Sequence, residues 1–165
     1  MFFTDEVTFK LTPNVPYGWQ PVGEQLSIRS SSDKVANIFG LLSYQGILKT
    51  FISKQNIDSD FIIECVDQIA EKINIPTVLV FDNAPWHTSA KIAQKLKQWE
   101  KRDLYIFYLP VYSPHLNIIE TLWRKIKLEW LKPKDYESSK SLKEALLHII
   151  KNYGSEFCIN FSKNV

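Results

Sequence analysis

Hydrophobic positions recur along the chain with two periods, one typical of strands and the other of helices. Five short runs rich in apolar residues predict strands: Met1–Thr4, Lys34–Ser43, Ile47–Ile52, Pro76–Phe81 and Leu104–Leu109. The second and third runs are joined by Tyr44-Gln45-Gly46, a spacing that predicts a hairpin. The last two are continuous apolar runs, as expected for strands buried on both faces. The segment Thr8–Gly23 is rich in Pro and Gly and predicts a loop and an edge strand.

Four further segments carry apolar residues at helical spacing. Asp58 is the predicted N-cap of the first helix, and Thr88 or Ser89 caps the second. The third and fourth helices are predicted at Ile118–Leu131 and Ser139–Tyr153. This order of elements predicts an α/β domain with a mixed central sheet of about five strands flanked by helices. We expect all 165 residues to form this single domain.

Carboxylates stand at the ends of three predicted elements. Asp5 follows the first apolar run, Asp82 follows Pro76–Phe81, and Glu120 lies near the start of the third helix. Acids at strand ends of an α/β sheet are common ligand positions, and hard oxygen ligands suit Mg²⁺ or Mn²⁺. The three acids predict a site for two ions that clamp the oxygens of a phosphodiester during in-line displacement.

Two of these acids have alternatives that the residues alone leave open. Glu6 adjoins Asp5, and because neighbouring strand residues face opposite sides of a sheet, only one of them can face the site. Asp82-Asn83 is also a common turn sequence, since both side chains can bond their own backbone.

Glu120 has two further explanations. With Asn117 it matches a capping box, in which the glutamate folds back onto the backbone at the start of the helix. With Arg124 it could form an ordinary surface pair one helical turn apart. A metal ligand would reach toward the other two acids instead.

Charge is distributed unevenly along the chain, although the net charge is only +2. Residues 1–90 carry 6 Lys and Arg against 10 Asp and Glu, whereas residues 91–165 carry 14 against 8. A basic C-terminal half indicates a polyanionic partner, and solvated Lys-rich helix faces are the alternative. The candidate phosphate contacts are Lys91, Lys95, Arg102, Arg124, Lys125 and Lys127.

Aromatic residues divide between predicted core and predicted loops. Helical spacing places three tryptophans inward: Trp99, Trp123 and Trp130. Three other aromatics fall in loops near the acids, where stacking on unpaired bases and structural packing are both open: Trp19, Trp86 and Tyr112.

Four motifs together resemble one family: TDE at 4–6, YGWQPVGE at 17–24, FDNAPWH at 81–87 and LPVYSPHLNIIETLW at 109–123. They resemble the DDE transposases of bacterial insertion sequences, in the mariner superfamily. The resemblance covers roughly Phe2–Trp130, with 37 residues between Asp82 and Glu120. It departs at Ile118, where the family often has proline.

The resemblance implies a ribonuclease-H-like fold and a Mg²⁺- or Mn²⁺-dependent endonuclease and strand transferase. Asp5, rather than Glu6, would act with Asp82 and Glu120 as the catalytic residues and ligands of two metal ions. His87 would contact a phosphate or order a metal-bound water, or else pack on Trp86. The implied partners are transposon-end and target DNA and a second copy of the chain, with no membrane. The expected location is the bacterial cytoplasm, at the nucleoid during action.

Family members usually carry a helix-turn-helix region for recognising element ends, and the sequence begins at the first catalytic strand. We expect that DNA-binding region to be absent. The alternative function is a truncated, non-catalytic fragment that dimerises with or regulates a full-length transposase. The intact set of three acids favours the active enzyme.

Overall fold

The computed structural model describes residues 1–13, 22–23 and 30–161. Its centre is a five-stranded sheet in the order β3-β2-β1-β4-β5. Strand β1 is antiparallel to β2 and parallel to β4, so the predicted mixed sheet of about five strands is confirmed. The predicted hairpin is confirmed as well, since β2 pairs with β3. The strands are β1 (Phe2–Lys10), β2 (Lys34–Leu42), β3 (Leu48–Ser53), β4 (Thr77–Phe81) and β5 (Leu104–Tyr108).

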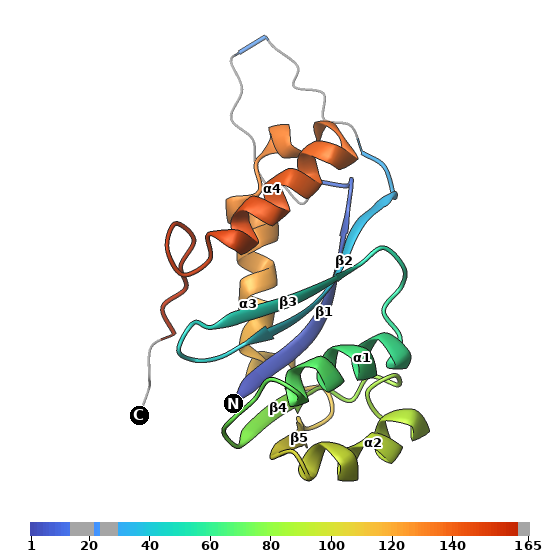
Figure 1. The fold of residues 1–165 in the computed structure, drawn as a ribbon. Helices are drawn as coiled ribbons and strands as arrows, with labels where there is room; N and C mark the ends of the chain where they lie inside the picture. The colour runs from blue at the N-terminus through green and yellow to red at the C-terminus, as the bar shows by residue number, and fades with distance from the viewer. Residues whose placement is uncertain (14–21, 24–29, 162–165) are drawn as a thin grey trace.

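Helices cover both faces of the sheet (Figure 1). On one face, α1 (Ser59–Ala70) and α2 (Ala90–Glu100) form a core with β4 and β5. On the other, α3 (Ile118–Lys125) and α4 (Ser139–Lys151) pack on β1 and β2. Helix α3 continues into a π-helical segment, and single 3₁₀ turns flank it. The π-helical segment is Ile126–Trp130, and the 3₁₀ turns are Pro114–Leu116 and Pro133–Glu137.

The predicted caps form. The side chain of Asp58 accepts from the backbone N–H of Phe61 at 3.0 Å, and Ser89 accepts from that of Ile92 at 3.4 Å. Among the described residues, no helix combines the length and the hydropathy needed to cross a membrane.

Strand β1 is longer than predicted, because it does not end at the acid pair. It pairs with β2 beyond Asp5 and Glu6 as far as Lys10. Val7 and Phe9 continue the inward alternation, and the core under α3 and α4 buries them. The acids are therefore held in the middle of a strand. Of the predicted loop and edge strand Thr8–Gly23, the first three residues belong to β1, and residues 14–21 lie outside the described residues.

Strand β5 is buried on one face only, so the prediction of a doubly buried strand was wrong here. It lies at an edge of the sheet, with Leu104 and Ile106 in the core that α2 covers. Tyr105 and Phe107 point away from that core and are 42% and 58% exposed. The continuous apolar run predicted two buried faces, but at the edge of the sheet only the face under α2 is covered.

Candidate active site

The register of the sheet brings Asp5 and Asp82 to the same region. Phe3 of β1 lies beside Val80 of the parallel strand β4. Extended by two residues, this register sets Asp5 beside Asp82, the first residue after β4. Asp5 shares the face of Phe3 and Val7, because side chains alternate along a strand. Asp82, which follows the strand, lines one pocket with Asp5 and Glu6 and another with Glu120.

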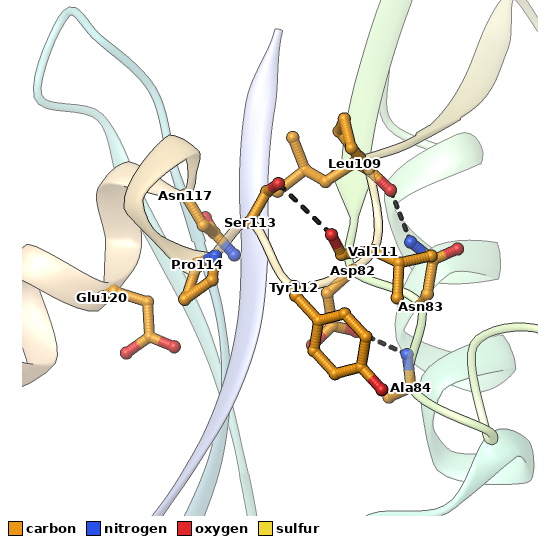
Figure 2. Close-up of a pocket in the computed structure, with 11 residues that line it drawn as sticks. Asp82, Asn83, Ala84, Leu109, Val111, Tyr112, Ser113, Pro114, Asn117 and Glu120 are labelled. Atoms are coloured by element: carbon orange, nitrogen blue, oxygen red, sulfur yellow. Dashed lines mark hydrogen bonds between the residues drawn. The ribbon is translucent and has the colours of Figure 1, made fainter.

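Glu120 enters the site from the first turn of α3. Helix α3 packs on β1 and β2. Glu120 and Asp82 both line a pocket of about 230 Å³. Figure 2 shows Glu120 and Asn117 on one side of β1 and Asp82 with Asn83 on the other.

The capping box does not form. The side chain of Asn117 makes no cap bond, and its Nδ2 donates to the backbone oxygen of Thr4 at 2.9 Å. Asn117 thus ties the start of α3 to β1. Its Oδ1 is buried and has no hydrogen-bond donor among the described residues. Within the described part of the chain, the Glu120 carboxylate accepts no backbone hydrogen bond and so remains available as a ligand.

Asp5 shows the electrostatic cost of this arrangement. Burial raises the pKa of the Asp5 carboxyl to about 8, and the charges of Glu120, Glu6 and Asp82 act in the same direction. A hydrogen bond from the backbone of Glu6 opposes this only partly. The charges of Glu120 and Asp82 therefore both reach the Asp5 carboxyl, an environment that a bound cation would relieve.

Glu6 faces the opposite way from Asp5 and is fully engaged there. Its Oε1 lies 2.8 Å from Nε2 of His87, and its Oε2 accepts from the indole N–H of Trp86 at 3.0 Å. Its side chain is only 13% exposed. Both oxygens of Glu6 are thus already occupied by hydrogen-bond donors, which supports Asp5 as the candidate ligand.

His87 links Glu6 to Asp82. Its side chain is fully buried, and its Nδ1 lies 2.6 Å from Oδ1 of Asp82. Burial lowers the pKa of His87, but hydrogen bonds and charges of Asp82 and Glu6 outweigh it and raise the pKa to about 9. The hydrogen bond from His87 in turn lowers the pKa of Asp82, against the effect of burial.

Both ring nitrogens of His87 are therefore occupied, and neither is free for the predicted contact with a phosphate. The ring packs instead on Phe81, with centroids 4.6 Å apart, and on Trp86, with centroids 6.2 Å apart. Sequence reasoning missed the interaction between His87 and Glu6, because 81 positions separate the two residues and no local spacing reports it.

Most of the candidate phosphate-binding cations already have carboxylate partners. Lys91 and Lys95 of α2 pair with acids of α1, Lys91 with Asp60 at 2.5 Å and Lys95 with Asp67 at 2.7 Å. Arg102, just after α2, lies 3.8 Å from Glu71, just after α1. Lys125 pairs with Glu129 at 2.6 Å. Their contact with DNA stays a prediction, and these ion pairs account for them without it.

Two of the cations lie by the acids. Lys127 is half-buried, with Nζ 5.5 Å from the ring centre of Phe9. Burial lowers the pKa of Lys127, and the nearby charges of Glu120 and Asp5 oppose that shift. Arg124 lines a second pocket with Glu120. Among the described residues, Arg124 and Glu120 form no ion pair, so the explanation of Glu120 as one half of a surface pair fails.

The donor set suits a hard cation. All three acids offer carboxylate oxygens, the ligands that Mg²⁺ and Mn²⁺ prefer. As the described side chains stand, no three His, Cys, Asp or Glu residues are grouped closely enough to hold an ion. The fit therefore rests on the chemistry and mutual charge of Asp5, Asp82 and Glu120, not on a formed coordination shell.

Comparison with known proteins gives a consistent family. A family model described as a DDE superfamily endonuclease matches residues 1–143. The insertion element IS630 uncharacterized 39 kDa protein of Shigella sonnei is 26% identical over 129 residues, which are 76% of this chain and 37% of that protein.

Solved structures share the fold. The Mos1 mariner paired end complex with Mn has a TM-score of 0.64 at 14% identity, over 94% of this chain and 49% of that one. The catalytic core domain of BIV integrase has a TM-score of 0.54 at 15% identity, over 93% of this chain and 85% of that one. The predicted ribonuclease-H-like fold is thereby confirmed. The chain spans about half the length of the Mos1 chain and less of the Shigella protein.

Proposed function

The chain belongs to the DDE endonuclease superfamily, and we propose that it is a transposase catalytic domain that cleaves and joins DNA with divalent metal ions. One observation carries the proposal. Asp5, Asp82 and Glu120 come from β1, the residue after β4 and the start of α3, and the charges of Glu120 and Asp82 both raise the pKa of the Asp5 carboxyl. Carboxyl groups with perturbed pKa values cluster at functional sites, and a bound cation would offset the repulsion between these acids.

Asp5, Asp82 and Glu120 would hold two Mg²⁺ or Mn²⁺ ions. The bound ions would neutralise phosphate charge and lower the pKa of a water molecule. The part played by the chain is to fix the acids on rigid elements. The bond from Asn117 to Thr4 supports this role, because it ties the helix that carries Glu120 to the strand that carries Asp5.

The proposed chemistry has two steps on DNA. In the first, water attacks a phosphorus at an element end, the P–O bond breaks, and a 3′-hydroxyl is released. In the second, that hydroxyl attacks a target phosphodiester, forming one P–O bond as another breaks. No covalent bond to the protein is needed, so the proposal requires no Ser or Tyr nucleophile.

Element-end and target DNA are the proposed partners. The structural relatives include a Mos1 paired-end complex with a left transposon end and a Mos1 strand transfer complex, which supports DNA as the substrate. Joining two ends requires two catalytic domains, so we propose a homodimer or larger assembly on DNA. The proposed place of action is the nucleoid in a bacterial cytoplasm.

The test is nicking of a supercoiled plasmid with Mn²⁺, comparing wild type with Asp82→Asn and Glu120→Gln. We expect nicking that depends on metal and falls at least 100-fold in both variants, since removal of a metal ligand removes the catalytic charge. Glu144→Gln is the matched control, because Glu144 is an exposed acid of α4 at 4.0 Å from Lys140. It should nick like wild type.

Nicking that persists unchanged in both variants would contradict the assignment of the acids. If wild type neither nicks nor binds Mn²⁺, the result would support the alternative function, a non-catalytic chain that dimerises with or regulates a longer transposase. Binding of Mn²⁺ without nicking would mean that the site forms but acts only with a further DNA-binding region.

A further inference from the structure

His87 is a buried histidine whose two ring nitrogens both meet carboxylates. Nδ1 lies 2.6 Å from Oδ1 of Asp82, and Nε2 lies 2.8 Å from Oε1 of Glu6. Carboxylates only accept, so the ring donates to both. The distance to Glu6 is typical of a charge-assisted hydrogen bond and the distance to Asp82 is slightly shorter, so both interactions are of the strong, directional kind.

The two oxygens of Asp82 have different surroundings. Oδ1 accepts from His87 and also from the backbone N–H of Ala84 at 2.9 Å. No side chain or backbone donor of the described residues reaches Oδ2. The carboxylate is therefore oriented by two bonds on one oxygen, and rotation about its side-chain torsions would break both. Asp82 remains 46% exposed, so the second oxygen is accessible from the site.

Each part of the unit that holds Asp82 is itself anchored. The indole of Trp86 donates to Oε2 of Glu6 at 3.0 Å. The backbone oxygen of Trp86 accepts from Ser59 of α1 at 2.8 Å, and that of His87 accepts from Tyr108 of β5 at 2.9 Å. The loop after β4 is thus tied to three different elements, and His87 cannot follow Asp82 if Asp82 rotates.

We infer that Glu6 and His87 are positioning residues that hold Asp82 with Oδ1 occupied and Oδ2 presented to a divalent metal ion. This inference rests on the proposed function, because it assumes that Asp82 is a ligand. Partners behind a ligand typically change metal affinity by about 10- to 100-fold when removed. Glu6 would thus act without touching the metal, which explains why a second acid adjoins Asp5.

The test compares two substitutions of similar size at His87. The Nδ2 of Asn can replace the ring Nδ1 and still donate to Asp82, whereas the Nε2 of Gln can replace the ring Nε2 and donates only to Glu6. Mn²⁺ affinity is measured by the electron paramagnetic resonance signal of free Mn²⁺, on the full chain and without DNA. We expect His87→Gln to bind about 10- to 100-fold more weakly than wild type, and His87→Asn to recover most of that loss.

Equal Mn²⁺ affinity in His87→Asn and His87→Gln would overturn the inference, because a purely structural role would not distinguish the two donors. His148→Asn is the matched control. His148 pairs with Glu156 at 3.2 Å, and both side chains are 57% exposed, so its loss should leave Mn²⁺ affinity unchanged. Asp82→Asn tests the proposed function separately. Wild-type affinity in that variant would refute Asp82 as a ligand and the inference with it.

If melting curves show that the His87 variants do not fold, Glu6→Gln takes their place. A glutamine has one acceptor oxygen, which cannot serve both His87 and Trp86, so the support of His87 is weakened while the volume is kept. We expect Mn²⁺ affinity between those of wild type and Asp82→Asn. Wild-type affinity in Glu6→Gln would overturn the inference.

Discussion

Gly40 of β2 faces the indole of Trp123 in α3 with no room for another carbon atom. A Cβ at position 40 would lie 2.5 Å from Cζ2 and 2.7 Å from Cη2 of Trp123, well inside the usual carbon–carbon separation of about 3.5–4.0 Å. Gly40 also pairs with Asp5 across the β1–β2 ladder. The absence of a side chain at position 40 therefore lets α3, which carries Glu120, approach the sheet beside Asp5.

Gly40→Ala should destabilise the protein by about 1–3 kcal/mol, the usual cost of overpacking a core. The added methyl must push α3 away from the sheet, which moves Glu120 away from Asp5. We expect Mn²⁺-dependent nicking to fall more than the folded fraction does. Chemical denaturation followed by tryptophan fluorescence, together with nicking assays on the same samples, measures both effects.

Trp123→Phe provides the internal control, because phenylalanine lacks the two ring carbons that the new methyl would meet. The indole N–H of Trp123 has no partner in the described structure, so this change removes no hydrogen bond. Gly40→Ala should cost less in the Trp123→Phe background, with a coupling on the order of 1 kcal/mol. Strict additivity of the two changes would contradict the steric explanation.

Asp67 links α1 to α2 on the other face of the sheet, so we expect its replacement to destabilise the packing of these two helices. Its carboxylate accepts from Lys95 at 2.7 Å and from the indole N–H of Trp99 at 2.7 Å. Asp67→Asn should lower the free energy of unfolding by about 1 kcal/mol, since the groups are partly screened by solvent. Glu71→Gln is the control. The exposed Glu71 pairs with Arg102 at 3.8 Å, and its change should cost almost nothing.

The same residue predicts a dependence of stability on pH. Burial raises the pKa of Asp67, but the hydrogen bonds from Lys95 and Trp99 outweigh it and leave the pKa below its ordinary value. The stabilisation is therefore complete above the unfolded-state pKa of about 3.9 and is lost as the pH falls through the folded-state value. Urea unfolding between pH 6 and pH 3 should show a shallower acid loss in Asp67→Asn than in wild type. Parallel curves would refute this account.

Local chemistry in the sequence predicted the elements with strong signals at their ends. Asp58 and Ser89 cap helices where predicted, because a side-chain oxygen just before a helix accepts a hydrogen bond from a free backbone N–H of the first turn. The length of β1 was missed for the opposite reason. An acid pair normally marks the end of a strand, whereas Asp5 and Glu6 lie inside one. Asp5 faces the candidate metal site on one face of the strand, and Glu6 bonds His87 and Trp86 on the other.

The sequence could predict only those parts of the candidate site that lie within a short motif. Asp82 and Glu120 could be proposed from the sequence because the first follows an apolar strand and the second lies near the start of an amphipathic helix. The bond between Glu6 and His87 was not found, since it joins β1 to a loop 81 residues later. The exposed face of β5 was missed because a continuous apolar run does not report which strand lies at the sheet edge.

The two cysteines should differ strongly in reactivity. Cys65 is 2% exposed, and burial, with a smaller effect of Glu64, raises the pKa of its thiol to about 12. Cys158 is exposed. Because the thiolate is the reactive form, a disulfide reagent at pH 8 should label one thiol quickly in native protein. In Cys158→Ser the fast phase should vanish, and the remaining labelling should follow global unfolding in denaturant. A persistent fast phase would contradict the buried position of Cys65.

Arg124 and Lys91 test which of the candidate cations meets DNA. Arg124 lines a pocket with Glu120, and no carboxylate of the described residues lies within ion-pair distance of it. Lys91 is 2.5 Å from Asp60 on α1. If DNA runs along the acids, Arg124→Ala should weaken binding uniformly across sequences and reduce the slope of log affinity against log salt by about 1. Lys91→Ala should leave that slope unchanged, because its charge is already neutralised by Asp60. Fluorescence anisotropy with a labelled duplex at several salt concentrations measures both slopes. The reverse result, a loss in Lys91→Ala and none in Arg124→Ala, would place the DNA over α1 and α2 instead and away from Glu120.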